Sequence, residues 1–276
     1  HYPLRRQRQM CIRDSNTVES WLAQLLENAH MNRPDEREKH KLSTIVVENY
    51  VGGFEEEDNV SERVELVTGT KNMPCDKFLE AWMYSWMINN FHNFGWSQAL
   101  TRFLRRYKNF TYLEMYDYLF QALKDDEGVV GGFYKHAQSQ MEHYLATGSD
   151  SNMEDGWSGH TYMWQIQPDF HKNRQHVVDF VNKTFNLEYT ELDQSLYTRL
   201  LQFQHDYVTD EPTEYPYSSQ HPFNFWEFIN GLDEFRERDT VYEINIGEDV
   251  KGDDYYDRFY FRRRQGWGKS VFSKND

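Results

Sequence analysis

The stretch MPCDKFLEAWMYSWMINNFHNFGWSQALTRFL, residues 73–104, decides the fold that we predict. Pro74 suits the first turn of a helix, where its missing backbone N–H has no intrahelical partner to lose. Beyond it, apolar side chains recur at helical spacing over much of the circumference, which is typical of a buried helix. The pattern breaks near Asn93 to Gly95, so the stretch predicts a pair of buried helices. The residues that carry the pattern are Phe78, Ala81, Trp82, Ser85, Trp86, Asn89, Phe94, Leu100, Phe103 and Leu104.

Two β-rich stretches precede these helices, Thr44–Val51 and Arg63–Thr68. Their β-branched content predicts strands. The glycine pair and carboxylates of Gly52–Asn59 between them indicate an acidic turn or exposed loop. Further upstream, helical spacing alone predicts a short amphipathic helix. That spacing is carried by Val18, Trp21, Leu22, Leu25 and Leu26.

Further helices follow residue 110. Thr111 is placed to act as the N-cap of one of them, because its hydroxyl can accept a bond from a free N–H of the first turn. The apolar face of this helix would contain Tyr112, Met115, Tyr116, Leu119 and Leu123. Gly131-Gly132 is expected to precede another helix, which reaches about Leu145. Helices are also expected near 161–184 and 190–208.

The remaining segments complete the predicted fold class, mainly α with a few β-strands (α+β). Gly148–Gly159 is rich in Ser, Asp and Gly and is the best linker candidate. Glu211–Phe228 is expected to be irregular or extended. Val241–Ile246 alternates as a strand does, and Asp253–Arg264 predicts a final amphipathic helix.

The basic segment HYPLRRQRQMCIRDS, residues 1–15, contrasts with an otherwise acidic chain. Codons that would encode it resemble an index followed by the transposase adapter of shotgun sequencing libraries. We therefore interpret residues 1–15 as a translated adapter, expect the biological sequence to begin near Asn16, and expect the chain to be a fragment. The segment has four arginines and one aspartate, so without it the formal charge of −15 becomes about −18.

Composition excludes several classes of protein. A chain this acidic repels a phosphate backbone, so we expect no nucleic-acid binding through a broad basic face. An aromatic content of 17% is sufficient for real cores. No run approaches the roughly 18 apolar residues of a membrane span, so we expect no membrane partner. With Cys11 in the adapter, Cys75 is left alone, which indicates a reducing compartment and a cytoplasmic protein.

Short motifs give no catalytic residue and no metal ligand. The closest histidine pairs are seven and five residues apart, and no HExxH is present. Gly268-Lys-Ser270 fails as a phosphate-binding loop because Arg263 stands where the motif needs glycine. The basic patch Arg262–Lys269 is interpreted as a helix C-terminus, with an anion grip as the alternative. Trp82 and Trp86, at i and i+4, are interpreted as core rather than as a stacking platform.

From Leu25 to about Phe120 the chain resembles the C-terminal part of cobalamin-binding radical S-adenosylmethionine (SAM) proteins. Leu25–Met31, LLENAHM, followed by Pro34–Lys39, is similar to the family's LLPNAPM and the DPEYREKYG-like run after it, with Glu27 and His30 in place of its two prolines. The other blocks that match in order are Leu66–Thr70, Asn72-Met73, Leu79–Trp82, Phe91-His92, Gly95 and the closing Tyr260–Lys269.

This resemblance implies an enzyme with a cobalamin domain, a radical SAM partial barrel and a C-terminal extension. Residues 16–70 would be the end of the barrel and a β-rich connection, 71–147 a helical extension, and 148–276 a C-terminal α+β region. Trp21–Glu27 would then be a late barrel strand rather than a helix, which is the interpretation we favour. In such enzymes a CxxxCxxC motif holds a [4Fe–4S] cluster, and SAM and cobalamin complete the cofactors. The chain lacks the three cysteines, so alone we expect it to be inactive.

The resemblance also suggests where cofactors would lie. The turn containing Asn28, His30 and Met31, at the end of the presumed strand, is the predicted cofactor-binding segment, with His92 a second candidate. Turn stabilisation by Asn28 and core packing by the others are the simpler roles. The whole enzyme would act on a small molecule or a peptide. The alternative is a free-standing acidic helical module that binds a protein partner through an exposed aromatic surface.

Overall fold

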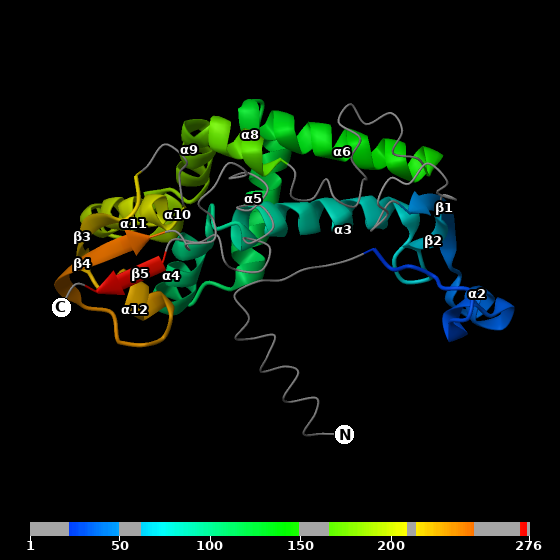
Figure 1. Cartoon of the computed structure of the whole chain (residues 1–276), viewed down its shortest axis with the longest axis horizontal. Coiled ribbons are helices and arrows are strands. Elements are labelled where there is room, and N and C mark those ends of the chain that lie inside the picture. Colours follow the sequence, from blue (N-terminus) through cyan, green and yellow to red (C-terminus); the bar gives the residue numbers. More distant parts are fainter. Residues whose placement is uncertain (1–21, 50–61, 149–165, 209–213, 246–270, 275–276) are drawn as a thin grey trace, which may run out of the picture. The chain divides into compact units, whose positions relative to one another are not determined.

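The structure is a computed structural model that describes residues 22–49, 62–148, 166–208, 214–245 and 271–274 (Figure 1). Helices dominate, and the strands form a two-stranded sheet, β1-β2, and a three-stranded sheet, β3-β4-β5. The predicted fold class, mainly α with a few β-strands, is confirmed. Within the described residues no sheet closes into a barrel. None of the described helices combines the length and hydropathy that crossing a membrane requires.

The chain divides into two units, which are described separately. Among the described residues, unit 1 comprises those within 87–130 and 167–276, and unit 2 comprises those within 19–86 and 131–166. Both units are assembled from segments that are distant in sequence. The predicted division at residues 70 and 147 stays a prediction.

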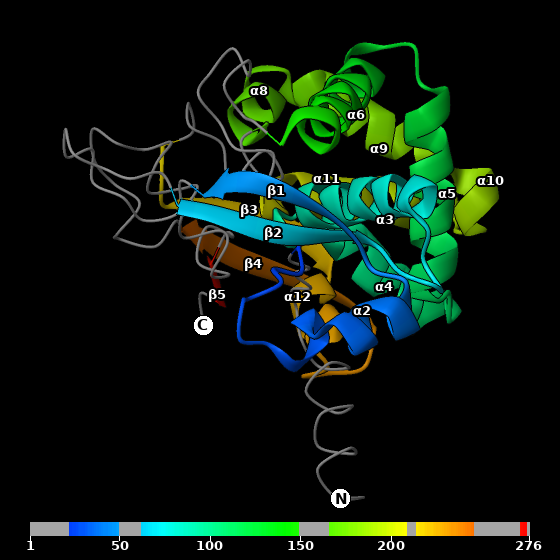
Figure 2. The ribbon, with the colours of Figure 1, turned by 90° about the vertical axis from the view of Figure 1, so that its right-hand side faces the viewer.

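Unit 2 contains β1 (Ser43–Asn49) and β2 (Glu62–Gly69), which pair antiparallel (Figure 2). The predicted stretch Arg63–Thr68 is therefore confirmed, and Thr44–Val51 is confirmed through Asn49. Arg37 of α2 (Pro34–His40) ties the two strands together, since its guanidinium donates to Glu65 Oε2 at 3.0 Å and to Thr44 Oγ1 at 3.1 Å. The predicted loop Gly52–Asn59 lies outside the described residues.

Residues 22–25 are extended, so the helix predicted from leucine spacing is wrong for the described part of that segment. Gln24 forms an antiparallel bridge with Leu66. Leu25 N–H donates to Glu65 O at 2.7 Å and Val67 N–H donates to Ala23 O at 2.9 Å. The physical reason is that β2 satisfies the backbone here, while Leu26 remains 62% exposed and gains nothing from a helical apolar face. The extended interpretation holds, with antiparallel pairing.

The core of unit 2 lies along α3 (Cys75–Met87) and α6 (Val129–Thr147), which each reach one or two residues into unit 1. Trp82 and Trp86 are 5% and 0% exposed, which confirms that they are core residues. The Trp86 ring meets the Tyr134 ring edge-on, with centroids 6.2 Å apart. This is a favoured aromatic geometry that adds to burial.

Glycines mark both ends of α6. The helix begins at Val129, so Gly131-Gly132 lies inside its first turn and the predicted start is slightly too late. A Cβ at position 132 would meet no atom within 4 Å. At the other end Gly148 has φ +69°, and a Cβ there would lie 2.3 Å from the Val46 carbonyl oxygen of β1. Only glycine allows the chain to pass β1 so closely in this conformation.

The predicted helix pair is confirmed, with α3 in unit 2 and α4 (Gln98–Lys108) in unit 1. The π-helix η2 (Ile88–Asn93) continues directly from α3, and Gly95, at φ +88°, separates it from α4. The predicted N-cap is also confirmed, because Thr111 and Glu114 form a full capping box at the start of α5 (Tyr112–Asp125).

The predicted helix 161–184 is interrupted in the described part at Asn173, between α8 (Gln167–Lys172) and α9 (Arg174–Thr184). The second, 190–208, corresponds to the short α10 (Leu187–Thr190) and to α11 (Gln194–Tyr207). Asn186 and Asp193 accept backbone N–H bonds at the two starts, which explains the break between them.

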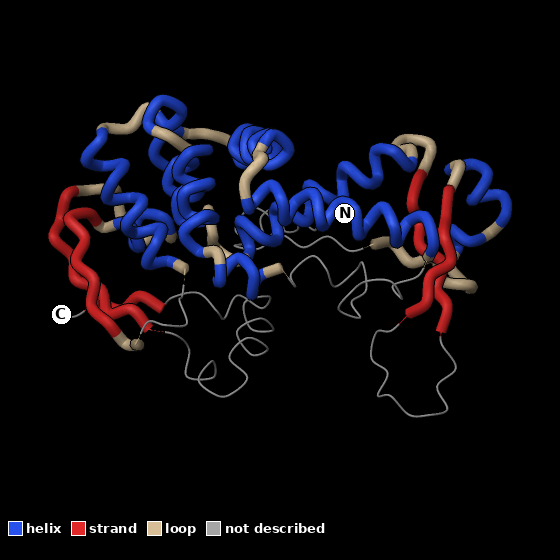
Figure 3. The backbone as a smooth tube through the Cα atoms, turned by 90° about the horizontal axis from the view of Figure 1, so that it is seen from above, coloured by secondary structure: helices blue, strands red, loops and turns tan. Residues whose placement is uncertain are grey.

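The sheet of unit 1 contains β3 (Tyr217–Phe223), β4 (Glu237–Asn245) and β5 (Val271–Lys274), all antiparallel (Figure 3). The predicted strand Val241–Ile246 is confirmed through Asn245. The extended prediction for Glu211–Phe228 holds over β3 but misses α12 (Phe225–Ile229). An aromatic core joins α4, α11, α12 and the sheet, and it contains Phe103, Phe203, Phe225, Phe228, Phe235 and Phe272.

Several predicted segments lie outside the described residues. These are residues 1–15, most of Gly148–Gly159, the helix Asp253–Arg264 and the basic patch Arg262–Lys269.

Candidate functional site

The predicted cofactor-binding turn lies in the 3-10 helix η1 (His30–Asn32) and the residues before it. Asn28, His30 and Met31 are all exposed, Met31 by 46%. The carboxamide that stabilises the turn belongs to Asn32, which donates to Leu26 O at 3.2 Å. Because none of the three side chains is buried, all are available to a ligand or a neighbouring chain segment.

His92, the second candidate, lies instead in a buried polar network around η2. Its Nδ1 shares a hydrogen bond with the Tyr116 hydroxyl, which lies 3.1 Å from Thr101 Oγ1. Nearby, Gln167 links Asn90, at 2.6 Å, to the Trp96 indole N–H, at 2.8 Å. These bonds satisfy polar groups that burial would otherwise penalise. His92 therefore has the core role that is its simpler interpretation.

A second buried polar cluster joins α11 to β3, and it centres on the Asp206 carboxylate. Ser219 Oγ donates to Asp206 Oδ2 at 2.5 Å, and His221 Nε2 lies 2.9 Å from the same oxygen. Tyr217 donates its hydroxyl to Asp206 Oδ1 at 3.3 Å. The three donors share one face of β3 because they alternate along it. We refer to Asp206, Tyr217, Ser219 and His221 as the Asp206 cluster.

The Asp206 cluster has the residue types of a serine hydrolase but not the geometry. In a catalytic triad the carboxylate and the serine bind opposite nitrogens of the imidazole. Here Ser219 Oγ, at 3.2 Å, and the carboxylate both lie at His221 Nε2. Nδ1 of His221 is buried and has no hydrogen-bond partner among the described residues. Since a carboxylate only accepts, the proton is on Nε2 and the imidazole cannot take the Ser219 proton.

The cluster strongly perturbs the acidity of its members. Burial by itself raises the pKa of Asp206, but the His205 imidazole, 3.8 Å away, and the hydrogen bonds from His221 and Ser219 outweigh it and hold that pKa far below its usual value. The pKa of Tyr217 is raised far above its usual value, first by burial and then by the Asp206 charge. The His221 side chain is fully buried against Phe203, Phe225 and Tyr242. The Asp206 carboxylate therefore stays ionised and links strand β3 to helix α11.

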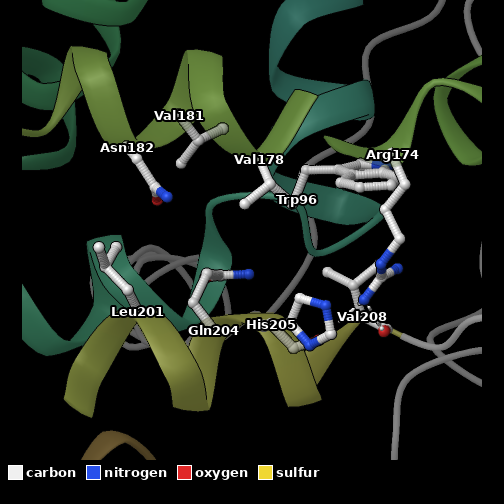
Figure 4. A pocket seen from close by; sticks show the side chains of 9 residues that line it. All are labelled: Trp96, Arg174, Val178, Val181, Asn182, Leu201, Gln204, His205 and Val208. Atoms are coloured by element: carbon white, nitrogen blue, oxygen red, sulfur yellow. Dashed lines mark hydrogen bonds between the residues drawn. The ribbon is translucent and has the colours of Figure 1, made fainter. Parts of the chain in front are cut away.

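A pocket lies between α9 and α11 (Figure 4). One of its lining residues, His205, directly precedes Asp206 in the sequence. Its empty volume is about 270 Å³, counted out to open solvent. Arg174 extends from α9 to the end of α11, where Nη2 donates to His205 O at 3.1 Å and to Val208 O at 3.0 Å. We refer to this as the α9–α11 pocket. It is lined by Trp96, Arg174, Val178, Val181, Asn182, Leu201, Gln204, His205 and Val208.

Sequence reasoning did not identify the Asp206 cluster or the α9–α11 pocket. Asp206 and His221 are 15 residues apart and meet only because β3 packs on α11. The alternation of Tyr217, Ser219 and His221 is a period-2 signal that could have indicated one polar strand face.

No protein-family model matches the chain. In part of its length it is similar to the cobalamin-dependent radical SAM methyltransferase TokK of Streptomyces tokunonensis, with 28% identity over 124 residues. The match covers 44% of this chain and 18% of that protein. The similarity to cobalamin-binding radical SAM proteins that the sequence motifs indicate thus extends to a known methyltransferase.

The residues of this chain do not fit the cofactors of such an enzyme. An iron–sulfur cluster bound through three cysteines needs more than the two in the sequence, and Cys75 is an exposed free cysteine. Among the described residues, no three His, Cys, Asp or Glu side chains are placed to hold a metal. The α9–α11 pocket is smaller than the usual range for drug-sized ligands, so neither a corrinoid nor a whole SAM molecule would fit in it.

Proposed function

We propose that this chain is the C-terminal part of a cytoplasmic, cobalamin-dependent radical SAM enzyme, either a radical methyltransferase or a related iron–sulfur oxidoreductase. The observation that carries the proposal is the 28% identity to a cobalamin-dependent radical SAM methyltransferase, taken with the ordered motifs between Leu25 and Phe120. The enzyme's substrate would be a small molecule or a peptide.

In this proposal the chain has no part in holding the [4Fe–4S] cluster. The cluster, SAM and cobalamin together supply the radical and methyl-transfer chemistry, and the cluster cysteines and the cobalamin domain would lie outside this sequence. What this chain contributes is a helical extension with its own buried cores, able to orient substrate and exclude water.

The proposal gives the turn at residues 28–31 a specific role. Asn28, His30 and Met31 follow an extended segment that pairs with β2, and their side chains are exposed. In the whole enzyme they would face the cofactor-bearing part. Alanine at all three positions should lower the cobalamin retained by the purified enzyme, while alanine at the exposed Glu38 of α2 should not.

The direct test begins with long-read sequencing of the source DNA outward from the Asn28 codon. We expect an open frame that continues upstream for several hundred residues and encodes CxxxCxxC. The whole protein, purified anaerobically, should then bind a cluster and cobalamin and form 5′-deoxyadenosine from SAM. Alanine in place of the three cysteines should abolish that product.

A different outcome would favour the alternative function. If the frame begins with a start codon just before Asn16, the radical SAM assignment is wrong. The chain would then be a free-standing acidic helical module that binds a protein partner.

A further inference from the structure

Helix α4 differs in charge from the chain that surrounds it. The whole sequence has a formal charge of −15, yet α4 contains four cations and no aspartate or glutamate. The cations are Arg102, Arg105, Arg106 and Lys108. The three arginines are spaced i, i+3 and i+4, so their side chains leave the helix on one face. Arg105 and Arg106 are exposed, and neither they nor Lys108 form an ion pair with a described carboxylate.

Only part of this charge has a structural role. Arg102 donates to Ile229 O and to Asn230 Oδ1, both at 3.0 Å, and so joins α4 to the end of α12. The other three cations lie in the last turn of α4. A helix dipole places about half an elementary negative charge at that end. Three positive charges exceed what offsets the dipole, so a surplus remains at the surface.

Aromatic rings position two of the surplus guanidinium groups. Arg105 lies over the Tyr112 ring of α5, 4.6 Å from its centroid, and Arg106 lies over the Phe228 ring of α12, 5.3 Å from its centroid. A ring covers one face of a guanidinium, whereas the N–H donors point outward in the guanidinium plane. These donors match the two oxygens of a carboxylate. Both arginines are therefore preorganised to bind an anion.

Exposed apolar side chains adjoin Arg106. A Cβ at Gly231 would lie 3.0 Å from Arg106 Nη1, so the guanidinium lies against the turn that follows α12. The next residue, Leu232, is 72% exposed, the highest value among the large hydrophobic residues described. Tyr107 is 42% exposed and contacts the Phe228 ring that Arg106 covers. We refer to this surface as the α4 patch, which consists of Arg105, Arg106, Tyr107 and Leu232.

We propose that the α4 patch docks a short acidic segment of a protein partner, in which carboxylates flank an apolar side chain. The carboxylates pair with Arg105 and Arg106, and the apolar side chain packs on Leu232 and Tyr107. Arginine and tyrosine are the residue types that are enriched where proteins bind one another. The inference does not rest on the radical SAM proposal, because it uses only residues of unit 1.

The composition of the patch favours a protein segment over a phosphate polymer. A phosphate group would gain nothing from contact with Leu232. A nucleic acid would also extend beyond the patch and meet the negative surface of the rest of the chain. A short segment confined to the patch lies mostly outside that repulsion, since surface charges are screened over about 8 Å at physiological salt.

The test is binding of fluorescein-labelled peptides to the whole purified chain, followed by fluorescence anisotropy at about 0.15 M salt. The probe is a peptide of repeated Glu-Ala-Leu-Glu units, about 20 residues long because shorter isolated helices are marginal in water. The matched probe has glutamine in place of every glutamate and keeps the leucines. We expect the acidic peptide to bind with a dissociation constant of about 0.1 mM or tighter, and the neutral peptide to bind at least about tenfold more weakly.

Variants locate the binding. The double variant Arg105→Gln/Arg106→Gln should weaken binding of the acidic peptide at least about tenfold. Its matched control, Lys183→Gln/Arg199→Gln, removes the same charge from exposed positions of α9 and α11 and should change the affinity less than about twofold. Leu232→Gln should weaken the acidic peptide at least about threefold, because it removes apolar contact.

Circular dichroism checks that each variant is folded. Because the arginines also pack on Tyr112 and Phe228, the exposed Leu232→Gln change tests the patch without disturbing those contacts.

Five results would overturn the proposal. The first two are no binding of the acidic peptide up to about 1 mM and equal binding of the two peptides. The third is unchanged binding by folded Leu232→Gln, which would indicate a purely electrostatic anion site. The fourth is tighter binding of an oligothymidylate of equal charge, which would assign the patch to nucleic acid. The fifth is self-association of the chain that Arg105→Gln/Arg106→Gln abolishes, which would make a second copy the partner.

Discussion

Replacing Asp206 by asparagine tests what attaches β3 to α11. The carboxylate accepts hydrogen bonds from Ser219, His221 and Tyr217 while its side chain is only 11% exposed. An asparagine keeps the shape but removes the charge. It also places an NH₂ group, which can only donate, among three donors.

The magnitude follows from the burial of the partners. A hydrogen bond to a charged group contributes about 1.5–3 kcal/mol, and a buried donor left without a partner costs about 1–3 kcal/mol. The His221 side chain is fully buried, and its Nδ1 has no hydrogen-bond partner among the described residues. A flipped His221 ring would therefore find no acceptor in place of the Asp206 carboxylate. Bonds that share one acceptor are not additive. We therefore expect Asp206→Asn to lower the free energy of unfolding by about 3 kcal/mol, as for breaking a buried ion pair.

The assay is urea unfolding, followed by circular dichroism and by tryptophan fluorescence. Using both signals tests whether the two units unfold together. A single free energy of unfolding is defined only if they do. The control is Asp179→Asn on α9, since Asp179 is exposed and accepts a hydrogen bond from Gln175, one turn earlier in the same helix. It should change stability by less than about 0.5 kcal/mol.

The pH dependence gives an independent check. Because the pKa of Asp206 is depressed in the folded protein, its stabilisation is fully present above the unfolded-state pKa. That stabilisation is lost as the pH falls below about 4. The difference between the wild-type chain and Asp206→Asn should therefore be constant from about pH 5 to 8 and should narrow at lower pH. A difference below about 1 kcal/mol at pH 7, or one that widens in acid, would refute the reasoning.

Three further predictions concern packing, caps and glycines, and unfolding in urea or by heat measures each. Trp86→Ala should cost about 3–5 kcal/mol, because the side chain is fully buried against Tyr134 and leaves a cavity; a cost under about 2 kcal/mol would mean that the site collapses. Thr111→Ala should cost about 1 kcal/mol by removing the capping box of α5, and Thr198→Ala, at an exposed position inside α11, should cost less. Gly132→Ala should stabilise α6 by about 0.5–1 kcal/mol, since the added Cβ meets no atom. Gly148→Ala should destabilise the folded protein by more than this, because the added Cβ would collide with Val46 O. A change of the same sign for both variants would contradict the argument.

The elements that sequence reasoning predicted correctly are those with local causes. The helix pair around Gly95, the Thr111 capping box and the strands of β1 and β2 depend on spacing, caps and β-branching within a few residues. Residues 22–25 were mispredicted from spacing because pairing with β2 is a non-local contact. Similarly, α12 is a single turn whose stability comes from packing Phe225 and Phe228 on Phe103.

The candidate sites were less accessible to sequence reasoning than the fold. The turn at Asn28–Met31 could be identified only through a family resemblance, and its role stays a prediction. The α9–α11 pocket combines residues from Trp96 to Val208, and nothing in their spacing brings them together. Arg174 illustrates the difficulty, because its importance depends on reaching the end of another helix rather than on its neighbours in sequence.

The π-helix η2 also affects how relatives of this chain should be aligned. Each turn of a π-helix contains about one residue more than a turn of α-helix, so η2 is equivalent to a single-residue insertion between α3 and α4. A homologue without that insertion would run α-helical through the same region and would present a different set of side chains at Asn89, Asn90 and Asn93. A one-position gap between Ile88 and Asn93 is therefore a structural difference to be kept in an alignment.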